Sequence, residues 1–334
     1  MRTIRMLLLG LAATALVLFP AGGAQASDDP SFKEQWGLSK IGAEAAWART
    51  TGAGIRVGIV DTGVDLEHED LAGKVVESTS CIGSNGDQGK CQGNAQDDQG
   101  HGSHVSGIVA ASKDNGKGIA GVAPGAQLVV AKAMDAQGTG NGTDVIAGIK
   151  WVVDHGAKVV NLSLGDPAQP ITALISENEL KEGVDYAWSH GVVPVLASGN
   201  SGTGLGIEGS NFGDMNAIIV GATGPDDKSA TYSTSTGRAK WAVAAPGGAG
   251  DSTKAHDIYS TFWIKGQKNA YTYLAGTSMA APHVAGAVAL LLAQGYSQGD
   301  AVKRILETAD KGVGCEAHST TCAGRINVDK ATTK

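Results

Sequence analysis

Five short apolar runs are the feature of this sequence that most restricts its fold. Each run is rich in β-branched residues and almost free of polar side chains, as are strands buried on both faces of a parallel sheet. They span residues 55–60, 128–133, 159–164, 192–197 and 217–222. Segments with helical spacing, 144–155 and 179–190, lie between the later runs, and Thr143 is placed to cap the first of them. This alternation predicts an α/β fold in which helices cover both faces of a parallel sheet.

The C-terminal part of the chain continues this pattern. Residues 239–244 are strand-like, residues 277–294 predict a long helix, and residues 300–309 predict an amphipathic helix. The sequence shows neither an internal repeat nor a linker. We therefore expect residues 27–334 to form a single domain.

The first 26 residues have the features of a secretory signal peptide. Arg2 and Arg5 precede an apolar run over residues 6–19, and Ala24, Gln25 and Ala26 form a small-residue cleavage site. The run is shorter than the roughly 20 residues that a membrane-spanning helix needs. We expect a secreted, extracellular protein that begins near Ser27 and keeps no membrane anchor.

The net charge argues against two classes of partner. The formal net charge is -7, and removal of Arg2 and Arg5 with the signal peptide makes it more negative by two. Nucleic acids and anionic membranes are therefore not expected as partners.

The four cysteines form two pairs that are local in the sequence, Cys81 with Cys91 and Cys315 with Cys322. An exported chain folds in an oxidising compartment, and of the three connectivities we favour the one that joins these local pairs. Zinc binding is the alternative, but neither pair has the spacing of two intervening residues that is typical of zinc sites.

Polar residues follow three of the predicted strands. Asp61 ends the first run within VDTGVD, Ser163 to Gly165 end another, and Asn200 follows a third in ASGN. Functional groups of open parallel sheets gather beyond the carboxyl ends of the strands. An isolated Asp or Asn in such a place is also a common turn residue, so these positions alone leave both interpretations open.

Two further motifs contain a serine and two histidines whose roles the residues alone leave open. Ser278 lies at the predicted start of a helix in GTSMAAPHVAG, where free backbone amides favour an anion, although a simple helix cap would also place a serine there. GHGSHVSG contains His101 and His104, and no third ligand of a metal site lies near them.

These four motifs together resemble those of the subtilisin-like serine proteases, and DDPSFKEQWGLSKIGAEAAW resembles the mature start of their thermitase-like branch. The order Asp, His, Ser along the chain is that of subtilisin. The resemblance implies a subtilisin-like three-layer fold and an endopeptidase that acts on polypeptides, which we expect to be a monomer. It implies that Asp61, His101 and Ser278 form the catalytic triad and that Asn200 donates to the oxyanion. His104 and His283 are then expected to be structural.

The resemblance also implies residues that bind the substrate. Ser163, Leu164 and Gly165 resemble the segment that pairs with an extended peptide backbone. Residues 206–218 depart from the usual sequence behind the primary specificity pocket, and counting back from Asn216 places Gly209 at its base with Glu208 beside it. The preference for a large apolar side chain is the family default, and a basic preference through Glu208 stays open.

A calcium site is expected from the same resemblance. Residues 111–121 resemble the calcium loop of the family, and the expected ligands are hard oxygens, which calcium prefers. They are the side chains of Asp29, Asp70 and Asn115 and the backbone carbonyls of Ser112, Lys117 and Ile119. Without the resemblance, a Gly-Asn turn and two solvated acids would explain these residues equally well.

Asp87, Asp97 and Asp98 form another acidic cluster, which is either a second cation site or a set of surface acids.

Two other functions fit the sequence less well. A catalytically inactive binding domain of this family would be marked by loss of a triad residue, and a lipase or esterase by a GxSxG motif; the sequence has neither mark.

Secreted relatives usually carry a propeptide after the signal, and we recognise none between Ser27 and the start of the catalytic region near Trp36.

Overall fold

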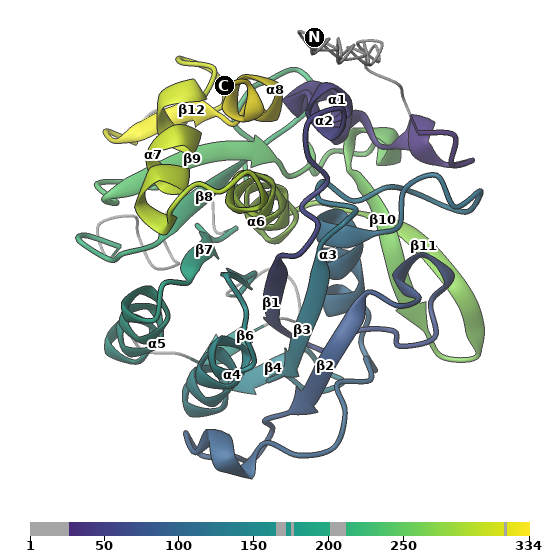
Figure 1. Cartoon of the computed structure of the whole chain (residues 1–334), viewed down its shortest axis with the longest axis vertical. Coiled ribbons are helices and arrows are strands. Elements are labelled where there is room, and N and C mark those ends of the chain that lie inside the picture. The colour runs from purple at the N-terminus through teal and green to yellow at the C-terminus, as the bar shows by residue number, and fades with distance from the viewer. Residues whose placement is uncertain (1–26, 165–171, 175–176, 201–211, 317–318) are drawn as a thin grey trace, which may run out of the picture.

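An eight-stranded sheet forms the centre of the protein (Figure 1). The computed structural model describes residues 27–164, 172–174, 177–200, 212–316 and 319–334. The strand order is β12-β9-β8-β7-β5-β1-β3-β2, and every neighbouring pair is parallel. The strands are β1 (Arg56–Asp61), β2 (Val75–Ser80), β3 (Gln127–Lys132), β5 (Val159–Leu162), β7 (Val193–Ala197), β8 (Ile218–Thr223), β9 (Trp241–Pro246) and β12 (Cys322–Arg325). The predicted parallel sheet is confirmed.

Helices cover both faces of this sheet, as Figure 1 shows. Successive residues of a strand point to opposite faces, and β1 follows this rule because Val57 and Ile59 join one hydrophobic core while Val60 joins the other. The first core contains α3 (His101–Ala110), α6 (Thr277–Ala293), α7 (Gln298–Thr308) and the short α1 (Trp36–Ile41), α2 (Ala43–Trp47) and α8 (Val328–Thr332); the second contains α4 (Gly142–Asp154) and α5 (Glu177–Ser189). The three-layer α/β fold is thus confirmed. None of the described helices is long and apolar enough to cross a membrane.

Two smaller sheets and four helical turns complete the described fold. Strand β10 (Ile258–Ile264) pairs with β11 (Gln267–Leu274) in an antiparallel hairpin, and β4 (Thr139–Asn141) pairs with β6 (Thr172–Leu174). The 3-10 turns are η1 (Phe32–Glu34), η2 (Glu69–Leu71), η3 (Gln88–Lys90) and η4 (Lys254–His256).

The predicted cap of α4 is wrong by two residues. The helix begins at Gly142, and the Asn141 side chain accepts a hydrogen bond from the Thr143 N–H at 3.0 Å. Asn caps a helix at least as well as Thr does, and the helix begins after Asn141 rather than after Thr143. In the same way, α7 begins at Gln298 because Ser297 accepts from the Asp300 N–H, two residues before the predicted start.

Both local disulfides are present. Cys81 bonds to Cys91 and closes the loop after β2, and Cys315 bonds to Cys322 at the start of β12. The buried Asp144 carboxylate at the start of α4 accepts from the N–H of Gly83 at 2.8 Å and holds the first of these loops against the helix.

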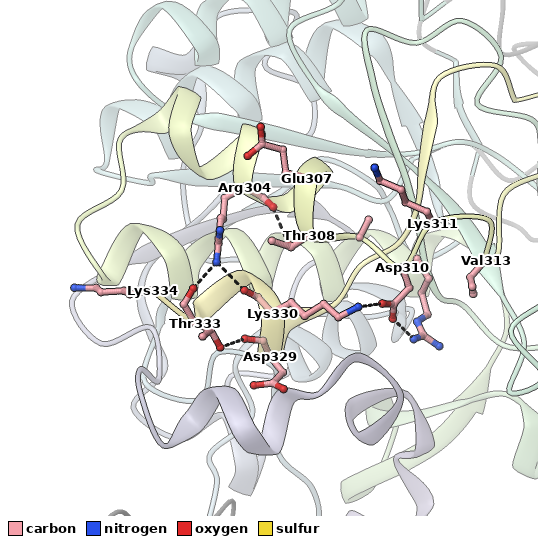
Figure 2. Close-up of a pocket in the computed structure, with 12 residues that line it drawn as sticks. Arg304, Glu307, Thr308, Asp310, Lys311, Val313, Asp329, Lys330, Thr333 and Lys334 are labelled. Atoms are coloured by element: carbon pink, nitrogen blue, oxygen red, sulfur yellow. Dashed lines mark hydrogen bonds and ion pairs between the residues drawn. The ribbon is translucent and has the colours of Figure 1, made fainter.

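Charged residues join the C-terminal helices to the sheet around a pocket of about 1000 Å³ (Figure 2). Asp310 accepts from Lys330 Nζ at 2.6 Å and from Arg325 Nη2 at 2.5 Å, and Arg325 also pairs with Asp227. Arg304 donates to the backbone carbonyls of Lys330, Ala331 and Thr333. The pocket therefore lies beside a structural ion-pair network that holds the end of the chain in place.

We expect Asp310→Asn to make stability less dependent on pH in acid. Burial raises the pKa of Asp310, but the hydrogen bonds from Lys330, Asn327 and Arg325 outweigh it and lower the pKa below its usual 3.8. A carboxyl group with a lowered pKa contributes stability above pH 3.8, and this contribution is lost as the pH falls through its folded value. The variant should lose about 1–3 kcal/mol near neutral pH, because the buried Arg325 guanidinium loses a charged partner.

The measurement is the melting temperature of the parent and the variant from about pH 6 down to about pH 2. Asp185→Asn is the control, because Asp185 forms an exposed pair with Lys181 and should contribute no more than about 0.5 kcal/mol. Parallel curves for the parent and Asp310→Asn would contradict the expectation.

Candidate active site

The polar residues predicted to follow the strands lie at one edge of the sheet. Strands β7, β5 and β1 are neighbours, and all three run in the same direction. Asp61 is the last residue of β1, Ser163 directly follows β5, and Asn200 lies three residues beyond the end of β7. The parallel arrangement therefore brings them together although they are far apart in the sequence.

A buried hydrogen bond joins Asp61 to His101, the first residue of α3. His101 Nδ1 lies 2.7 Å from Asp61 Oδ1, which also accepts from the Thr62 N–H at 2.7 Å. Asp61 is fully buried and His101 is 6% exposed. A carboxylate can only accept, so the bond places the proton of a neutral imidazole on Nδ1 and leaves Nε2 free to take up another.

Ser278 is the second residue of α6, and its backbone is fixed from the sheet. Its carbonyl accepts from Ser163 Oγ at 2.8 Å, and Ser163 Oγ in turn accepts from Asn161 Nδ2 at 2.8 Å. Helix α6 also packs against α3, which carries His101. Within the described part of the chain there is no hydrogen bond between the Ser278 hydroxyl and His101; such bonds are often long until a substrate binds.

The Asn200 side chain is oriented by the start of α6. Its Oδ1 accepts from both the N–H and the hydroxyl of Thr277, at 2.8 and 2.9 Å. These two bonds fix which end of the amide faces the helix, so Nδ2 remains available as a donor. Gly276 allows the close approach, because a Cβ there would lie only 3.2 Å from Asn200 Nδ2.

Comparison with known proteins identifies the family of this fold and site. The sequence profile of the subtilase family matches residues 52–328, which is most of the chain. The chain belongs to the subtilase family.

Several relatives of this subtilase agree with that assignment. Thermitase of Thermoactinomyces vulgaris is 38% identical over 305 residues, covering 91% of this chain and 98% of thermitase. Subtilisin DY of Bacillus licheniformis is 38% identical over 262 residues, covering 78% of this chain and 84% of that protein. A solved structure of proteases from Pseudoalteromonas arctica has a TM-score of 0.72 at 26% identity and covers 92% of this chain and 99% of that one. The predicted resemblance is confirmed, and this subtilase is a serine endopeptidase.

Two other histidines of the subtilase are buried and neutral. Burial lowers the pKa of His104 to about 3, with a further contribution from His101, and burial lowers the pKa of His283 to about 4. His104 Nε2 lies 3.1 Å from the Ile258 carbonyl, and Thr261 Oγ1 donates to the Ser103 carbonyl at 2.6 Å. His104 therefore helps to hold the β10–β11 hairpin against α3.

The residues of the expected calcium site lie together at the end of α3. The Asp29 carboxylate is 3% exposed and accepts from the N–H groups of Asp114, Asn115 and Gly116. The fully buried Asp70 carboxylate accepts from Asn115 Nδ2 at 2.9 Å, from the Ile119 N–H at 2.8 Å and from the Tyr271 hydroxyl at 2.8 Å. Two buried carboxylates thus converge on one loop.

The backbone of this loop also suits a hard cation. Among the hydrogen bonds of the described residues, none is accepted by the carbonyl oxygens of Ser112, Lys117 and Ile119, the three expected backbone ligands. The side-chain oxygen of Asn115, Oδ1, by contrast, accepts from the Lys117 N–H at 2.8 Å, so the side-chain amide would have to turn to bind a cation. With that change, the residues present fit a calcium ion.

The three acids considered for a second cation site have separate partners. Asp87 caps η3 through the Gly89 N–H, Asp97 is fully buried among N–H and hydroxyl donors, and Asp98 pairs with Lys132 at 2.7 Å. No group of three acidic, histidine or cysteine side chains placed to hold a metal occurs among the described residues. Among the described residues, these three carboxylates thus bind separate groups and do not meet at one point.

Some expected residues lie outside the described part of the chain, and others were missed. Gly165, Glu208 and Gly209 are outside the described residues. Thr277, which orients Asn200, and Asn161, which donates to Ser163, were not expected. Thr277 directly precedes Ser278 and Asn161 lies two residues before Ser163, so a polar side chain close to a predicted site residue was the available signal.

We expect Asn200→Ala to lower kcat by about 100-fold or more with little change in KM, because the bond from Nδ2 forms mainly in the transition state. This magnitude is the one known for an oxyanion donor of subtilisin. Steady-state hydrolysis of a peptide substrate measures it, with Asn216→Ala as the control because Asn216 binds only the surface Lys240 among the described residues. An effect on KM alone would instead make Asn200 a substrate-binding residue.

Proposed function

We propose that this subtilase is an extracellular endopeptidase in which Ser278 is the nucleophile, His101 the general base and Asp61 the residue that orients His101. The observation that carries the proposal is the buried 2.7 Å bond from His101 Nδ1 to Asp61 Oδ1. It fixes the tautomer that a general base needs and stabilises the imidazolium once a proton arrives on Nε2.

The proposed reaction has two steps that mirror each other. Ser278 Oγ attacks the carbonyl carbon of the peptide bond and gives its proton to His101 Nε2. His101 then passes that proton to the leaving amine as the C–N bond breaks, and the acyl group remains on Ser278. Water repeats the sequence against this ester, releases the carboxylic acid and returns the proton to Ser278.

Asn200 Nδ2 and the Ser278 N–H would stabilise the oxyanion in both steps. Support for Asn200 comes from the two bonds that its carbonyl accepts from Thr277, which leave the amide nitrogen as the free end. Ser278 lies in the first turn of a long helix, where backbone N–H groups have no partner within the helix. Donors fixed before the reaction need no rearrangement when the charge develops.

Substrate binding and location complete the proposal. Ser163, Leu164 and Gly165 would pair with an extended substrate beyond the carboxyl end of β5, with Gly209 at the base of the specificity pocket. Two disulfides support export to an oxidising compartment. We propose that residues 1–26 are a signal peptide and that residues 27–334 form one catalytic domain that acts as a monomer.

We also propose that the protein binds one structural calcium ion. The ligands would be the Asp29, Asp70 and Asn115 side chains and the carbonyls of Ser112, Lys117 and Ile119. A bound calcium ion supplies positive charge that offsets the two buried carboxylates. These residues link the N-terminus to the loop that follows the helix of His101, so the site would order both.

We expect Ser278→Ala to lower peptide hydrolysis by about 10⁵-fold or more while the fold remains intact. A serine-directed fluorophosphonate should label the parent on Ser278 and leave the variant unlabelled. Circular dichroism and the melting temperature provide the control for folding. Hydrolysis of casein by the variant at the rate of the parent would show that Ser278 is not the nucleophile.

We expect calcium to raise the melting temperature and the yield of active enzyme after dilution from denaturant. Binding to the folded state alone stabilises by about 2.7 kcal/mol when the ion is at a hundred times its Kd. The double change Asp70→Ala with Asn115→Ala should reproduce the effect of a chelator and remove the response to calcium. Asp87→Ala is the control, because Asp87 lies in an exposed turn away from these residues. Equal melting temperatures with calcium and with chelator would contradict the site.

A further inference from the structure

Asp97 is a fully buried carboxylate that the proposed reaction does not use. It lies between the segment that follows Asp61 at the end of β1 and the first turn of α3, which begins with His101. A buried carboxylate is costly unless donors surround it, so the donors around Asp97 show what its position requires.

Five hydrogen bonds surround the Asp97 carboxylate. Oδ1 accepts from Thr62 Oγ1 at 3.0 Å and from the N–H groups of Gln99 and Gly100 at 3.0 and 2.9 Å. Oδ2 accepts from the Ser103 N–H at 2.9 Å and from Ser103 Oγ at 2.6 Å. One carboxylate thus binds both the residue after Asp61 and the residues on either side of His101.

The two hydroxyl groups extend this connection. Thr62 Oγ1, which donates to Asp97, accepts from the Gly102 N–H of α3 at 2.9 Å. Ser103 Oγ, which also donates to Asp97, accepts from the Asp65 N–H at 2.8 Å. Each segment therefore places a hydroxyl against the other, and Asp97 fixes the direction in which both hydroxyls donate.

The backbone holds Asp97 in the same place. Its N–H donates to the Val64 carbonyl at 3.0 Å, and the Val64 N–H donates to the Ala95 carbonyl at 2.8 Å. The two segments are also in tight contact, because a Cβ on Gly102 would lie 2.1 Å from the Gly63 carbonyl oxygen. Neither segment has room to move toward the other if a bond to Asp97 is lost.

We propose that Asp97 is a positioning residue that holds Asp61 and His101 in their reactive geometry. The second oxygen of the Asp61 carboxylate has no hydrogen-bond partner among the described residues, so its bonds to His101 and to the Thr62 N–H are what orient it. The angle and length of the His101 bond then depend on how the two backbone segments are held, which is what Asp97 determines. The inference rests on the proposed roles of Asp61 and His101.

The test replaces Asp97 with a side chain of the same shape. In Asp97→Asn the amide oxygen can face Thr62, Gln99 and Gly100, but the NH₂ group then faces the Ser103 N–H, which loses its acceptor. We expect kcat to fall by about 10- to 100-fold with KM changed less than about threefold, because misplacement by about 1 Å costs on this scale. The fluorophosphonate labelling rate of Ser278 should fall by a similar factor.

Asp65→Asn is the matched control. Asp65 is buried in the same segment, and among the described bonds its carboxylate accepts only from the Glu67 N–H, at 3.1 Å. The control removes the same charge from the same region while its backbone N–H can still donate to Ser103 Oγ, and it should keep kcat within about threefold of the parent. Ser103→Ala keeps the Asp97 carboxylate but removes one linking hydroxyl, and we expect it to lower kcat by an intermediate factor.

A proton resonance separates positioning from simple loss of stability. The proton in the short bond between His101 Nδ1 and Asp61 should give a strongly downfield NMR signal, recorded in a Ser278→Ala background that prevents self-digestion. We expect it to shift or broaden in Asp97→Asn and to remain in Asp65→Asn, at a temperature where both are folded. If Asp97→Asn keeps the parent's kcat and resonance, the inference is wrong, while loss of activity in Ser278→Ala would still support the proposed function. If Ser278→Ala is fully active, the proposed function is wrong regardless of the resonance.

Discussion

The bond between Asp61 and His101 places the strictest requirement on the rest of this structure. It puts a carboxylate at the end of the central strand β1 with no exposure to water, where an uncompensated charge would be costly. The charge is tolerated because the Thr62 N–H and His101 donate to it at 2.7 Å each. The segment that follows strand β1 and helix α3 must therefore meet closely, and Gly102 allows this because a Cβ there would lie 2.1 Å from the Gly63 carbonyl oxygen.

Ser278 and Asn200 are connected to Asp61 and His101 through the sheet rather than through a loop. Asn161 and Ser163 hold the Ser278 carbonyl from β5, and Asn200 holds Thr277 from beyond β7. Helix α6 is almost wholly buried, and these contacts fix its first turn against the sheet. The geometry of the site thus comes from three adjacent strands, β7, β5 and β1, and from two largely buried helices, α3 and α6.

The sequence predicts the centre of this fold better than its margins. Strands such as β3 and β8 are continuous apolar runs because helices cover both of their faces, and that burial is visible in the residues themselves. Of the two edge strands, β2 (VVESTS) is polar over most of its length and β12 (CAGR) has only four residues, so no apolar run marked them as strands. The β10–β11 hairpin was also missed, although its strands contain aromatic and β-branched residues; polar residues alternate with these, so neither strand is a continuous apolar run.

Acidic residues show where reasoning from the sequence ends. The neighbours of Asp61, Asp70 and Asp97 in the sequence do not show what each carboxylate binds, and only the family motifs separate their expected roles. Asp97 was considered as a cation ligand, whereas the fold surrounds it with N–H and hydroxyl donors. Whether a carboxylate faces donors or other oxygens depends on contacts between segments that are far apart in the chain.

The neutral state of His104 and His283 gives the folded protein a built-in sensitivity to acid. Both imidazoles have a pKa near 6.5 when unfolded, against about 3 and about 4 in the folded state. Between those values the unfolded chain binds more protons than the folded one, so each drop in pH below 6.5 favours unfolding. His104 is buried between the β10–β11 hairpin and the helix of His101, and burial is what lowers its pKa, so it would take up a proton only when this contact opens to water. The protease would then be inactivated by acid through a histidine that takes no part in the reaction.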